Sequence, residues 1–301
     1  MGEKILLSVL VNEFNFNEYT VKFVNEKPFK YFARATSKID ESKCLFVGDA
    51  KYAIQIDDNT DMVITTEEVY EKIKDFHCGF CITEKPRNVF FNLMNEYEQK
   101  YRREQFPTIY GENVSLGKYV SISEYNVKIG SNVVIEDFVQ IMPNVSIGDN
   151  TIIRAGSKIG VHTFNLYREF GITKQMYHAG QTVIGKNVLI GHNNVIEQAI
   201  YRYGVTRISD NCMLDANVLI GHNDELAECC TVTAGTCIAG YVTVGSNTVI
   251  RLGVSIKNGI SIGENSHIGM GSVVVRKVRP NSRMFGNPAV DLTRGGLLTG
   301  F

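Results

Sequence analysis

The residue best suited to acid–base chemistry in this chain is His222, in the stretch MLDANVLIGHNDELAE (residues 213–228). A histidine can accept a proton near neutral pH because its unperturbed pKa is about 6.5. Around it, Leu214, Ile220 and Leu226 recur every six residues with small or polar residues between them. His222 therefore either fills a turn of this repeat or performs chemistry at a position that the repeat supplies.

A cysteine pair, Cys78 and Cys81 in FHCGFC, has the spacing of a redox motif or half a zinc site. The chain has no second CxxC, and the pair opens a strand-like run, whereas a zinc site needs four ligands and a redox motif favours a helix start. We therefore expect two small buried side chains. Seven cysteines, an odd number, fit reduced thiols better than a disulfide framework.

A period of six residues begins at residue 129 and predicts the architecture that holds His222. Neither a helix nor a flat strand buries every sixth residue over such a length, whereas a coil with flat faces does. Three hexads make one triangular coil, and stacked coils about 4.8 Å apart pair their backbones. Glycines often follow the aliphatic residue, as at tight corners that exclude a side chain or need positive φ. The aliphatic ladder comprises Ile129, Ile135, Ile141, Ile147, Ile153, Ile159, Ile184, Ile190, Ile196, Ile208, Leu214, Ile220, Leu226, Val232, Ile238, Val244, Ile250, Ile256, Ile262, Ile268 and Val274.

Two interruptions break the ladder, at residues 161–183 and, more briefly, at 197–207. The first is expected to be a functional loop that leaves the coil, because long loops without repeat character usually carry function. The resulting domains are 1–105, 106–283 with the inserted loop 161–183, and a C-terminal tail, 284–301.

The domain before the repeats is expected to be a small α/β domain. Strand-like runs occupy residues 5–11, 44–50 and 61–66, and a helix is predicted from Pro86 because proline suits the first helical turn. The whole fold is then mainly β, with a parallel β-helix after this domain.

Composition excludes some partners. The formal charge of −1, from 31 basic and 32 acidic residues among 301, provides no global field to attract nucleic acid or anionic membrane. The N-terminal apolar run is too short for a membrane anchor and lacks a cleavage pattern, so we expect a cytoplasmic protein with no membrane insertion.

Three stretches carry a family resemblance: GVHTFN…HAGQTVIGKNVLIGHNNVIEQ, RISDNCMLDANVLIGHNDEL and IKNGISIGENSHIGMGSVVVRKVRPNSRMFGNPA. In this order they resemble the hexapeptide-repeat acyltransferases, in particular UDP-3-O-acylglucosamine N-acyltransferase of lipid A synthesis and related nucleotide-sugar N-acetyltransferases. The resemblance implies a left-handed parallel β-helix and a homotrimer. The left hand comes from the resemblance, since most parallel crossovers are right-handed.

The resemblance also implies a catalytic role for His222, which matches the family's histidine as general base for direct attack on a thioester. Asp215, seven residues earlier, matches an aspartate and is the first candidate to orient the imidazole. Asp224 is the alternative, or else a side chain that faces solvent. An oxyanion donor is expected near Gly240, where a small residue lets the thioester approach.

The family's binding residues are carried over by matching positions. SKIDESKCLFVGDAKYAIQI resembles a uridine-binding segment, so Phe46 and Tyr52, with Lys51, are expected to hold a UDP- or dTDP-linked sugar, at about 1–3 kcal/mol of stacking per base. His162 and His178 of the inserted loop are expected to contact the sugar or phosphates. The residues matched to coenzyme A binding are Gly240, Gly253, Lys257, Gly271, Arg276 and Lys277.

The C-terminal GMGSVV…PNS…GNPA is similar to coenzyme A-dependent acetyltransferases, and Lys257, Asn258 and Gly259 replace the lipid A enzyme's second histidine. The predicted reaction is therefore acetyl transfer from acetyl-CoA to the amine of a nucleotide-linked sugar, with no metal. Transfer from acyl carrier protein in lipid A synthesis and sugar O-acetylation remain alternatives. A zinc enzyme of the γ-carbonic anhydrase type would need three converging histidines, including a close pair, and a β-helical assembly scaffold would leave the aromatic pair unused.

His192 stands in LIGHNN, which nearly repeats the His222 stretch, but thirty residues earlier. That spacing predicts a different face of the triangular coil. We therefore interpret His192 as a structural repeat rather than as a second catalytic residue.

Overall fold

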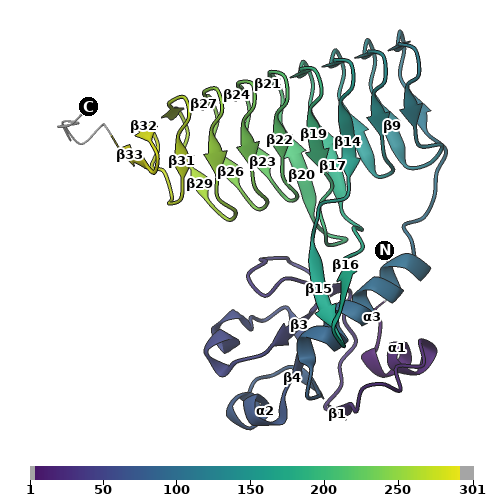
Figure 1. The fold of residues 1–301 in the computed structure, drawn as a ribbon. Helices are drawn as coiled ribbons and strands as arrows, with labels where there is room; N and C mark the ends of the chain where they lie inside the picture. Colours follow the sequence, from purple (N-terminus) through teal and green to yellow (C-terminus); the bar gives the residue numbers. More distant parts are fainter. Residues whose placement is uncertain (1–3, 292–301) are drawn as a thin grey trace. The chain divides into compact units, whose positions relative to one another are not determined.

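The computed structural model describes residues 4–291, which divide into two compact units (Figure 1). Unit 1 holds the chain up to Arg103 together with two later pieces, Phe164–His178 and Tyr201–Tyr203. Unit 2 holds the remaining segments, from Glu104 to the end of the described chain. Unit 2 thus begins next to the predicted boundary at 105, and part of the predicted inserted loop belongs to unit 1.

Unit 1 is built on a five-stranded sheet in which β3, β4 and β5 run parallel. The expected strands at residues 44–50 and 61–66 are confirmed as β3 and β4, and the helix expected from Pro86 is confirmed as α3. The sheet order is β1 (Lys22–Val24), β5 (Gly79–Ile82), β4 (Thr60–Thr65), β3 (Lys43–Val47) and β2 (Tyr31–Phe32). The helices are α1 (Leu7–Glu13), the 3-10 helix η1 (Ala50–Gln55), α2 (Glu67–Ile73) and α3 (Pro86–Lys100).

The strand expected at residues 5–11 is wrong, because the chain forms helix α1 there. Leu7 and Leu10, three residues apart, are both buried, which places them on one helical face. Periodicity alone does not separate a short apolar strand from a short buried helix, so this run was ambiguous in the sequence.

The cysteine pair of unit 1 is buried, as expected, with Cys81 inside β5 and Cys78 just before it. Burial raises the pKa of Cys78 to about 11 and that of Cys81 to about 12. Thiols held in the protonated form are poor nucleophiles and poor metal ligands. Both cysteines therefore serve as small packing residues.

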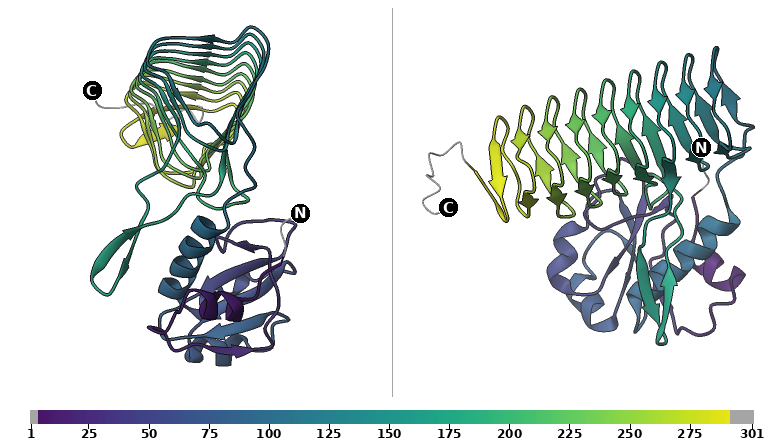
Figure 2. Two further views of the ribbon diagram at one scale, coloured as in Figure 1. Left: turned by 90° about the vertical axis from the view of Figure 1, so that its right-hand side faces the viewer. Right: turned by 45° about the horizontal axis from the view of Figure 1, so that its top comes forward.

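Unit 2 is a coil whose strands stack into three faces, seen from two sides in Figure 2. Within each face the coil strands are parallel and in register, for example Ile196 beside Ile220 and Ile220 beside Ile238. Face 1 contains β6 (Ile109–Tyr110), β9 (Val127–Ile129), β12 (Val145–Ile147), β17 (Gln181–Ile184), β20 (Val205–Ile208), β23 (Glu225–Leu226), β26 (Thr243–Val244) and β29 (Ser261–Ile262). Face 2 contains β7 (Ser115–Leu116), β10 (Val134–Ile135), β13 (Ile152–Ile153), β18 (Leu189–Ile190), β21 (Met213–Leu214), β24 (Thr231–Val232), β27 (Val249–Ile250), β30 (His267–Ile268), β32 (Arg283–Gly286) and β33 (Ala289–Asp291). Face 3 contains β8 (Ser121–Ile122), β11 (Gln140–Ile141), β14 (Lys158–Val161), β19 (Val195–Glu197), β22 (Leu219–Ile220), β25 (Cys237–Ile238), β28 (Ser255–Ile256) and β31 (Val273–Val274).

The chain passes from face 1 to face 2, then to face 3 and back to face 1. We call the three lines of turns edge A (face 1 to face 2), edge B (face 2 to face 3) and edge C (face 3 to face 1). Each edge repeats once per coil. Residues at equivalent turns therefore stack along an edge about 4.8 Å apart.

The six-residue ladder forms the core of unit 2, since every ladder residue from Ile129 to Val274 is at most 4% exposed. The glycine after a ladder residue excludes a side chain: a Cβ on Gly148 would lie 2.6 Å from the carbonyl carbon of Gly185 in the next coil. Positive φ falls mostly two residues later, at Asn150 (φ 58) for example, although Gly160 itself has a φ of 77. Asparagine tolerates this left-handed conformation better than most residues do.

Both interruptions of the ladder leave the coil at edge C, between faces 3 and 1. The first contains an antiparallel hairpin of β15 (Leu166–Glu169) and β16 (Ile172–Gln175), so the predicted loop 161–183 has strands of its own. The coil resumes at β17 after the first interruption and at β20 after the second. The predicted tail from residue 284 continues face 2 through most of β32 and then β33, and residues 292–301 lie outside the described chain.

Candidate active site

His222 lies on edge C, in the turn between β22 and β23. The two coils before it carry the two interruptions at the same edge, since these follow β14 and β19 on face 3. Three consecutive coils thus depart from the regular repeat along one line, either by an excursion of the chain or by a histidine. This concentration of irregular features marks edge C as the candidate active site.

The imidazole of His222 occupies space that Gly240 leaves open in the next coil. A Cβ on Gly240 would lie 2.6 Å from Cε1 and 2.7 Å from Cδ2 of His222. The ring also meets Tyr241 edge-on, with ring centroids 4.9 Å apart. Gly240 was expected to be small so that a thioester could approach; its small size also makes room for the imidazole of His222.

Three consecutive main-chain N–H groups of the His222 turn donate to side-chain oxygens. The bonds run from Gly221 to Asp224 Oδ2 (2.8 Å), from His222 to Glu197 Oε2 (2.9 Å) and from Asn223 to Thr206 Oγ1 (2.8 Å). The backbone that carries the histidine is therefore held from several sides.

Asp224 is fully buried, so the idea that it faces solvent is wrong. Its Oδ1 accepts the N–H of Val242 at 2.8 Å while its Oδ2 accepts that of Gly221. Burial raises the pKa of Asp224 well above its usual value, against these two hydrogen bonds, which lower it. Asp224 stands four residues after ladder residue Ile220, an inward position that Val242 fills in the next coil. The position of this carboxylate at an inward place in the hexad was the sequence signal that could have predicted its burial.

Glu197, which the sequence reasoning missed, is the last residue of β19 and lies beside the His222 turn. Burial raises the pKa of Glu197, opposed by hydrogen bonds from the Thr163 side chain and from the His222 N–H. The charge of Glu197 also contributes to the raised pKa of Asp224. Two carboxyl groups therefore flank the main chain of one histidine.

Within one chain the structure does not bring Asp215 beside His222, so the predicted orienting contact is not formed there. Asp215 follows β21 on face 2 and so lies on edge B, whereas His222 follows β22 on face 3. Its Oδ1 accepts the N–H of the adjacent Ala216 at 2.7 Å. Asp215 lines a pocket together with His192 and Arg154.

His192 lies on edge B, as its spacing from His222 predicted. Its turn is built in a similar way: the buried Asn194 accepts the N–H of Val218 at 2.6 Å, as Asp224 accepts that of Val242. The near-repeat of the two sequences therefore reflects the construction of a turn.

The residues expected to bind coenzyme A fall on two edges. Gly253 and Gly271 are exposed edge B turn residues with positive φ (66° and 68°). Lys257, Arg276 and Lys277 are exposed and follow face 3 strands, so they share edge C with His222 and Gly240. At one coil per 4.8 Å, the turn of Lys257 is about 10 Å, and that of Arg276 about 14 Å, from the turn of His222. The two sets share no edge within one chain.

The expected nucleotide-binding residues lie in unit 1, on β3 and η1. Phe46 is half-buried and packs against Phe90 and Phe91, with ring centroids 5.3 and 5.6 Å away. Tyr52 is 47% exposed, with the Lys51 ammonium 5.0 Å from its ring centroid. Tyr52 thus has a ring available for stacking, and Phe46 has part of one.

The two loop histidines are placed differently. His162 is exposed and belongs to unit 2, while His178 is 1% exposed and belongs to unit 1. A buried side chain in this position does not meet a ligand from solvent. The burial of His178 therefore does not support the expected contact between this side chain and the sugar.

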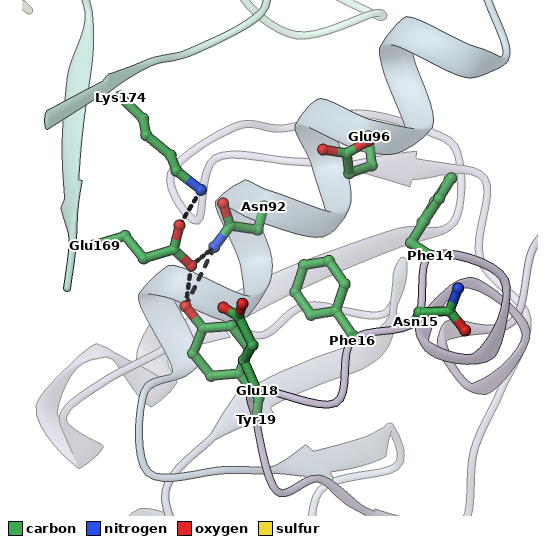
Figure 3. A pocket seen from close by; sticks show the side chains of 9 residues that line it. All are labelled: Phe14, Asn15, Phe16, Glu18, Tyr19, Asn92, Glu96, Glu169 and Lys174. Atoms are coloured by element: carbon green, nitrogen blue, oxygen red, sulfur yellow. Dashed lines mark hydrogen bonds and ion pairs between the residues drawn. The ribbon is translucent and has the colours of Figure 1, made fainter. Parts of the chain in front are cut away.

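A polar pocket in unit 1, drawn in Figure 3, was not anticipated. Glu169 of the hairpin accepts hydrogen bonds there from Tyr19 and Asn92 and pairs with Lys174. Although burial opposes ionisation, the partners Lys174 and Tyr19 hold the pKa of Glu169 below its usual value. This network fastens the hairpin to α3 and to the segment after α1 within unit 1.

Between residues 4 and 291 no group of three or more His, Cys, Asp or Glu side chains is arranged to hold a metal ion. None of the helices described in that range is both long and apolar enough to cross a membrane.

Comparison with known families and structures identifies the repeat. The family described as bacterial transferase hexapeptide (six repeats) matches residues 126–160, and the hexapeptide repeat of succinyl-transferase matches residues 181–222 and 241–276. A UDP-N-acetylglucosamine acyltransferase from Campylobacter jejuni is 26% identical with a TM-score of 0.55, covering 61% of this chain and 69% of that one. An LpxA structure from Acinetobacter baumannii, 21% identical with a TM-score of 0.56 over 64% of this chain and 74% of that one, shares the fold. The predicted fold class, a left-handed parallel β-helix after a small α/β unit, is confirmed.

Curated relatives carry the name that the motifs suggested. A probable UDP-3-O-acylglucosamine N-acyltransferase 2, mitochondrial, from Arabidopsis thaliana is 30% identical over 150 residues, which are 50% of this chain and 49% of that protein. A UDP-3-O-acylglucosamine N-acyltransferase from Rickettsia massiliae is 35% identical over 99 residues, 33% of this chain and 28% of that protein. The matched part thus spans half or less of these relatives, and the resemblance to hexapeptide-repeat acyltransferases is confirmed.

Proposed function

We propose that this chain, whose β-helix carries the hexapeptide repeats of bacterial transferases, transfers an acetyl group from coenzyme A to the amino group of a UDP- or dTDP-linked amino sugar. The observation that carries the proposal is the His222 turn: its backbone is held by side-chain oxygens, and its ring lies over Gly240. The names of the curated relatives support acyl transfer to a UDP-sugar.

The proposed chemistry is a direct transfer. The sugar amine attacks the thioester carbonyl carbon, a C–N bond forms, and the C–S bond breaks. His222 takes the proton from the attacking nitrogen and returns it to the departing thiolate, as a general base that becomes a general acid. A main-chain N–H near Gly240 would hold the developing oxyanion. Nitrogen is favoured over oxygen as the acceptor because the curated relatives are named N-acyltransferases.

The cations on edge C suit a phosphorylated donor. Lys257, Arg276 and Lys277 are exposed and follow the edge away from His222, and exposed cations attract phosphate groups. In the proposed complex the thioester end lies near His222 and the phosphates near these cations. Acyl carrier protein, the donor in the alternative reading, also presents a phosphopantetheine arm, so the two donors must be separated by experiment.

A homotrimer would explain why the expected donor-binding residues occupy two edges. Gly253 and Gly271 lie on edge B, and the cations lie on edge C. If edge B of one copy lies beside edge C of another, both sets line one groove. Light scattering of the purified protein tests the trimer, and a monomer that is fully active would refute it. Location in the cytoplasm is part of the same proposal, as the compartment that supplies acetyl-CoA and nucleotide sugars.

The proposed function is tested by comparing the acetyl-transfer activity of the His222→Ala variant with that of the wild type. Thiol release from acetyl-CoA is followed with UDP- and dTDP-linked amino sugars, and the variant is expected to lose about 10²–10⁴-fold in kcat. His267→Ala, which removes a histidine from face 2, is the control and should retain wild-type kcat. A folded His222→Ala variant with near wild-type kcat would show that the base is assigned wrongly.

Ligand-induced thermal shifts identify the donor and the nucleotide. Acetyl-CoA at 100 times its dissociation constant should stabilise the folded protein by about 2.7 kcal/mol, and holo-acyl carrier protein should have no effect at matched concentration. UDP and dTDP are titrated in the same way against Tyr52→Ala, which should weaken binding by about 1–3 kcal/mol if the base stacks on this ring. Stabilisation by acyl carrier protein alone would move the proposal to the alternative donor.

A further inference from the structure

The turn that carries His222 differs in main-chain bonding from the two turns that follow it on edge C. In those two turns the third residue donates its N–H to the second residue's carbonyl in the preceding coil: Tyr241 to His222 at 2.9 Å and Gly259 to Gly240 at 3.0 Å. The N–H of Asn223 holds the same position but donates to Thr206 Oγ1. The second interruption, which begins in the preceding coil, has removed the usual carbonyl from this place.

Side chains replace the missing main-chain contact. Asn223 Oδ1 accepts the N–H of Ile200 at 3.2 Å, so this side chain also holds the interrupted segment. Glu197, where that segment begins, accepts the N–H of His222 at 2.9 Å. The Thr163 side chain bonds to the same carboxyl group. Thr163 is the last residue of unit 2 before the chain enters the inserted hairpin of unit 1.

We propose that Glu197 is a positioning residue for His222, which fixes the main chain of the catalytic turn and connects it through Thr163 to the base of the inserted hairpin. Glu197 acts through His222 and does not touch the reacting atoms. The proposal rests on the proposed acyl transfer for its kinetic effect, but the position of the imidazole can be followed without any substrate.

The effect should appear in the ring because Glu197 accepts the N–H of His222 itself, at 2.9 Å. The imidazole lies so close to Gly240 that even a Cβ there would be 2.6 Å from its Cε1, so the position of the ring depends on the position of its main chain. Loss of the Glu197 acceptor releases the His222 N–H and lets the turn move away from the preceding coil. A misplacement of about 1 Å can cost about 100-fold in rate.

Edge B offers a matched control for this arrangement. Glu136 follows ladder residue Ile135 as Glu197 follows Ile196, and its Oε2 accepts the N–H of Ala155 at 3.1 Å. Its other oxygen pairs with Arg154. Edge B thus has the same hydrogen bond between a carboxylate and a turn of the next coil, but here the residue that donates its N–H is an alanine and not a histidine.

The experiment compares Glu197→Ala and Glu197→Gln with Glu136→Ala. Each variant is measured for kcat and KM in acetyl transfer, for thermal unfolding, and for the His222 ring signal in protein labelled with ¹³C-histidine. That signal is assigned by its loss in His222→Gln. Glu197→Ala should lower kcat about 10- to 100-fold with KM changed less than about threefold, and should shift or broaden the ring signal. Glu197→Gln keeps an oxygen acceptor and should restore most of kcat, while Glu136→Ala should change stability without changing kcat.

Two results would overturn the proposal: a Glu197→Ala variant with wild-type kcat and an unshifted ring signal, or a Glu197→Gln variant as slow as Glu197→Ala. The second would show that charge, and not the hydrogen bond, is what matters. Failure of the proposed function looks different. If His222→Ala transfers acetyl normally, or no variant has activity, the ring signal still decides whether Glu197 positions His222.

Discussion

Replacing Gly240 with alanine should remove most of the activity while leaving the fold largely intact. The added Cβ would lie 2.6 Å from Cε1 and 2.7 Å from Cδ2 of His222, where ordinary contacts begin at 3.4 Å. Gly240 does not have positive φ, so alanine adds no backbone strain. The ring must therefore retreat by on the order of 1 Å, which should cost about 100-fold in kcat, or about 2.7 kcal/mol of transition-state stabilisation.

The accompanying loss of stability should be smaller. His222 is half-buried and can turn toward solvent, so relief of the clash does not require the core to move. We expect the free energy of unfolding to fall by less than about 1 kcal/mol, within the range of substitutions that avoid the core. Acetyl-transfer kinetics give kcat, and urea unfolding gives the stability.

Gly235→Ala is the matched control, with the opposite expected pattern. No atom lies within 4 Å of a Cβ there, but Gly235 has φ +68°, which strains any side chain. It should lose about 1 kcal/mol of stability and retain kcat. If Gly240→Ala showed wild-type kcat and an unchanged His222 ring signal, the placement of the imidazole against Gly240 would be refuted.

Three further outcomes are expected. Asp224→Ala leaves the N–H of Val242 without its carboxylate acceptor and should lower the free energy of unfolding by about 1–3 kcal/mol in urea unfolding. Burial raises the pKa of Glu197. Its contribution to stability is therefore present below the unfolded pKa of about 4.3 and is lost as pH rises through the folded pKa. The unfolding temperature of the wild type should fall over that pH range relative to that of Glu197→Gln, and a rise would contradict the direction of the pKa shift. Glu169→Ala removes the acceptor of Tyr19 and should accelerate amide exchange in β15 and β16; unchanged exchange would show that the network does not hold the hairpin.

The coil could be predicted from the sequence because its cause is local and repeated. Each ladder residue from Ile129 to Val274 packs on its equivalent in the next coil, so one rule of spacing accounts for the entire core. The separation of His192 from His222 around the coil also followed from spacing. The helix at Pro86 followed from a proline that has no N–H to lose in the first turn.

The partners of His222 could not be predicted because they depend on where the interruptions rejoin the coil. Asp215 was chosen by its distance along the sequence, but one hexad moves a residue to another edge. Glu197 comes beside His222 only after the second interruption has been folded back. Asp224 is different, because an inward hexad position already indicated burial. At residues 5–11 the apolar run gave no period long enough to separate helix from strand.

The return of both excursions to the edge that they leave has a consequence for how this chain can change in length. The chain leaves face 3 after β14 and rejoins the coil on face 1 at β17, so the coil keeps its phase whatever number of residues lies between them. Lengthening or shortening the hairpin therefore leaves every later rung, including that of His222, on its own face. A single residue added inside a hexad would instead turn all later rungs out of register. Edge C thus allows new segments to be inserted beside the turn of His222 without rebuilding the coils that support it.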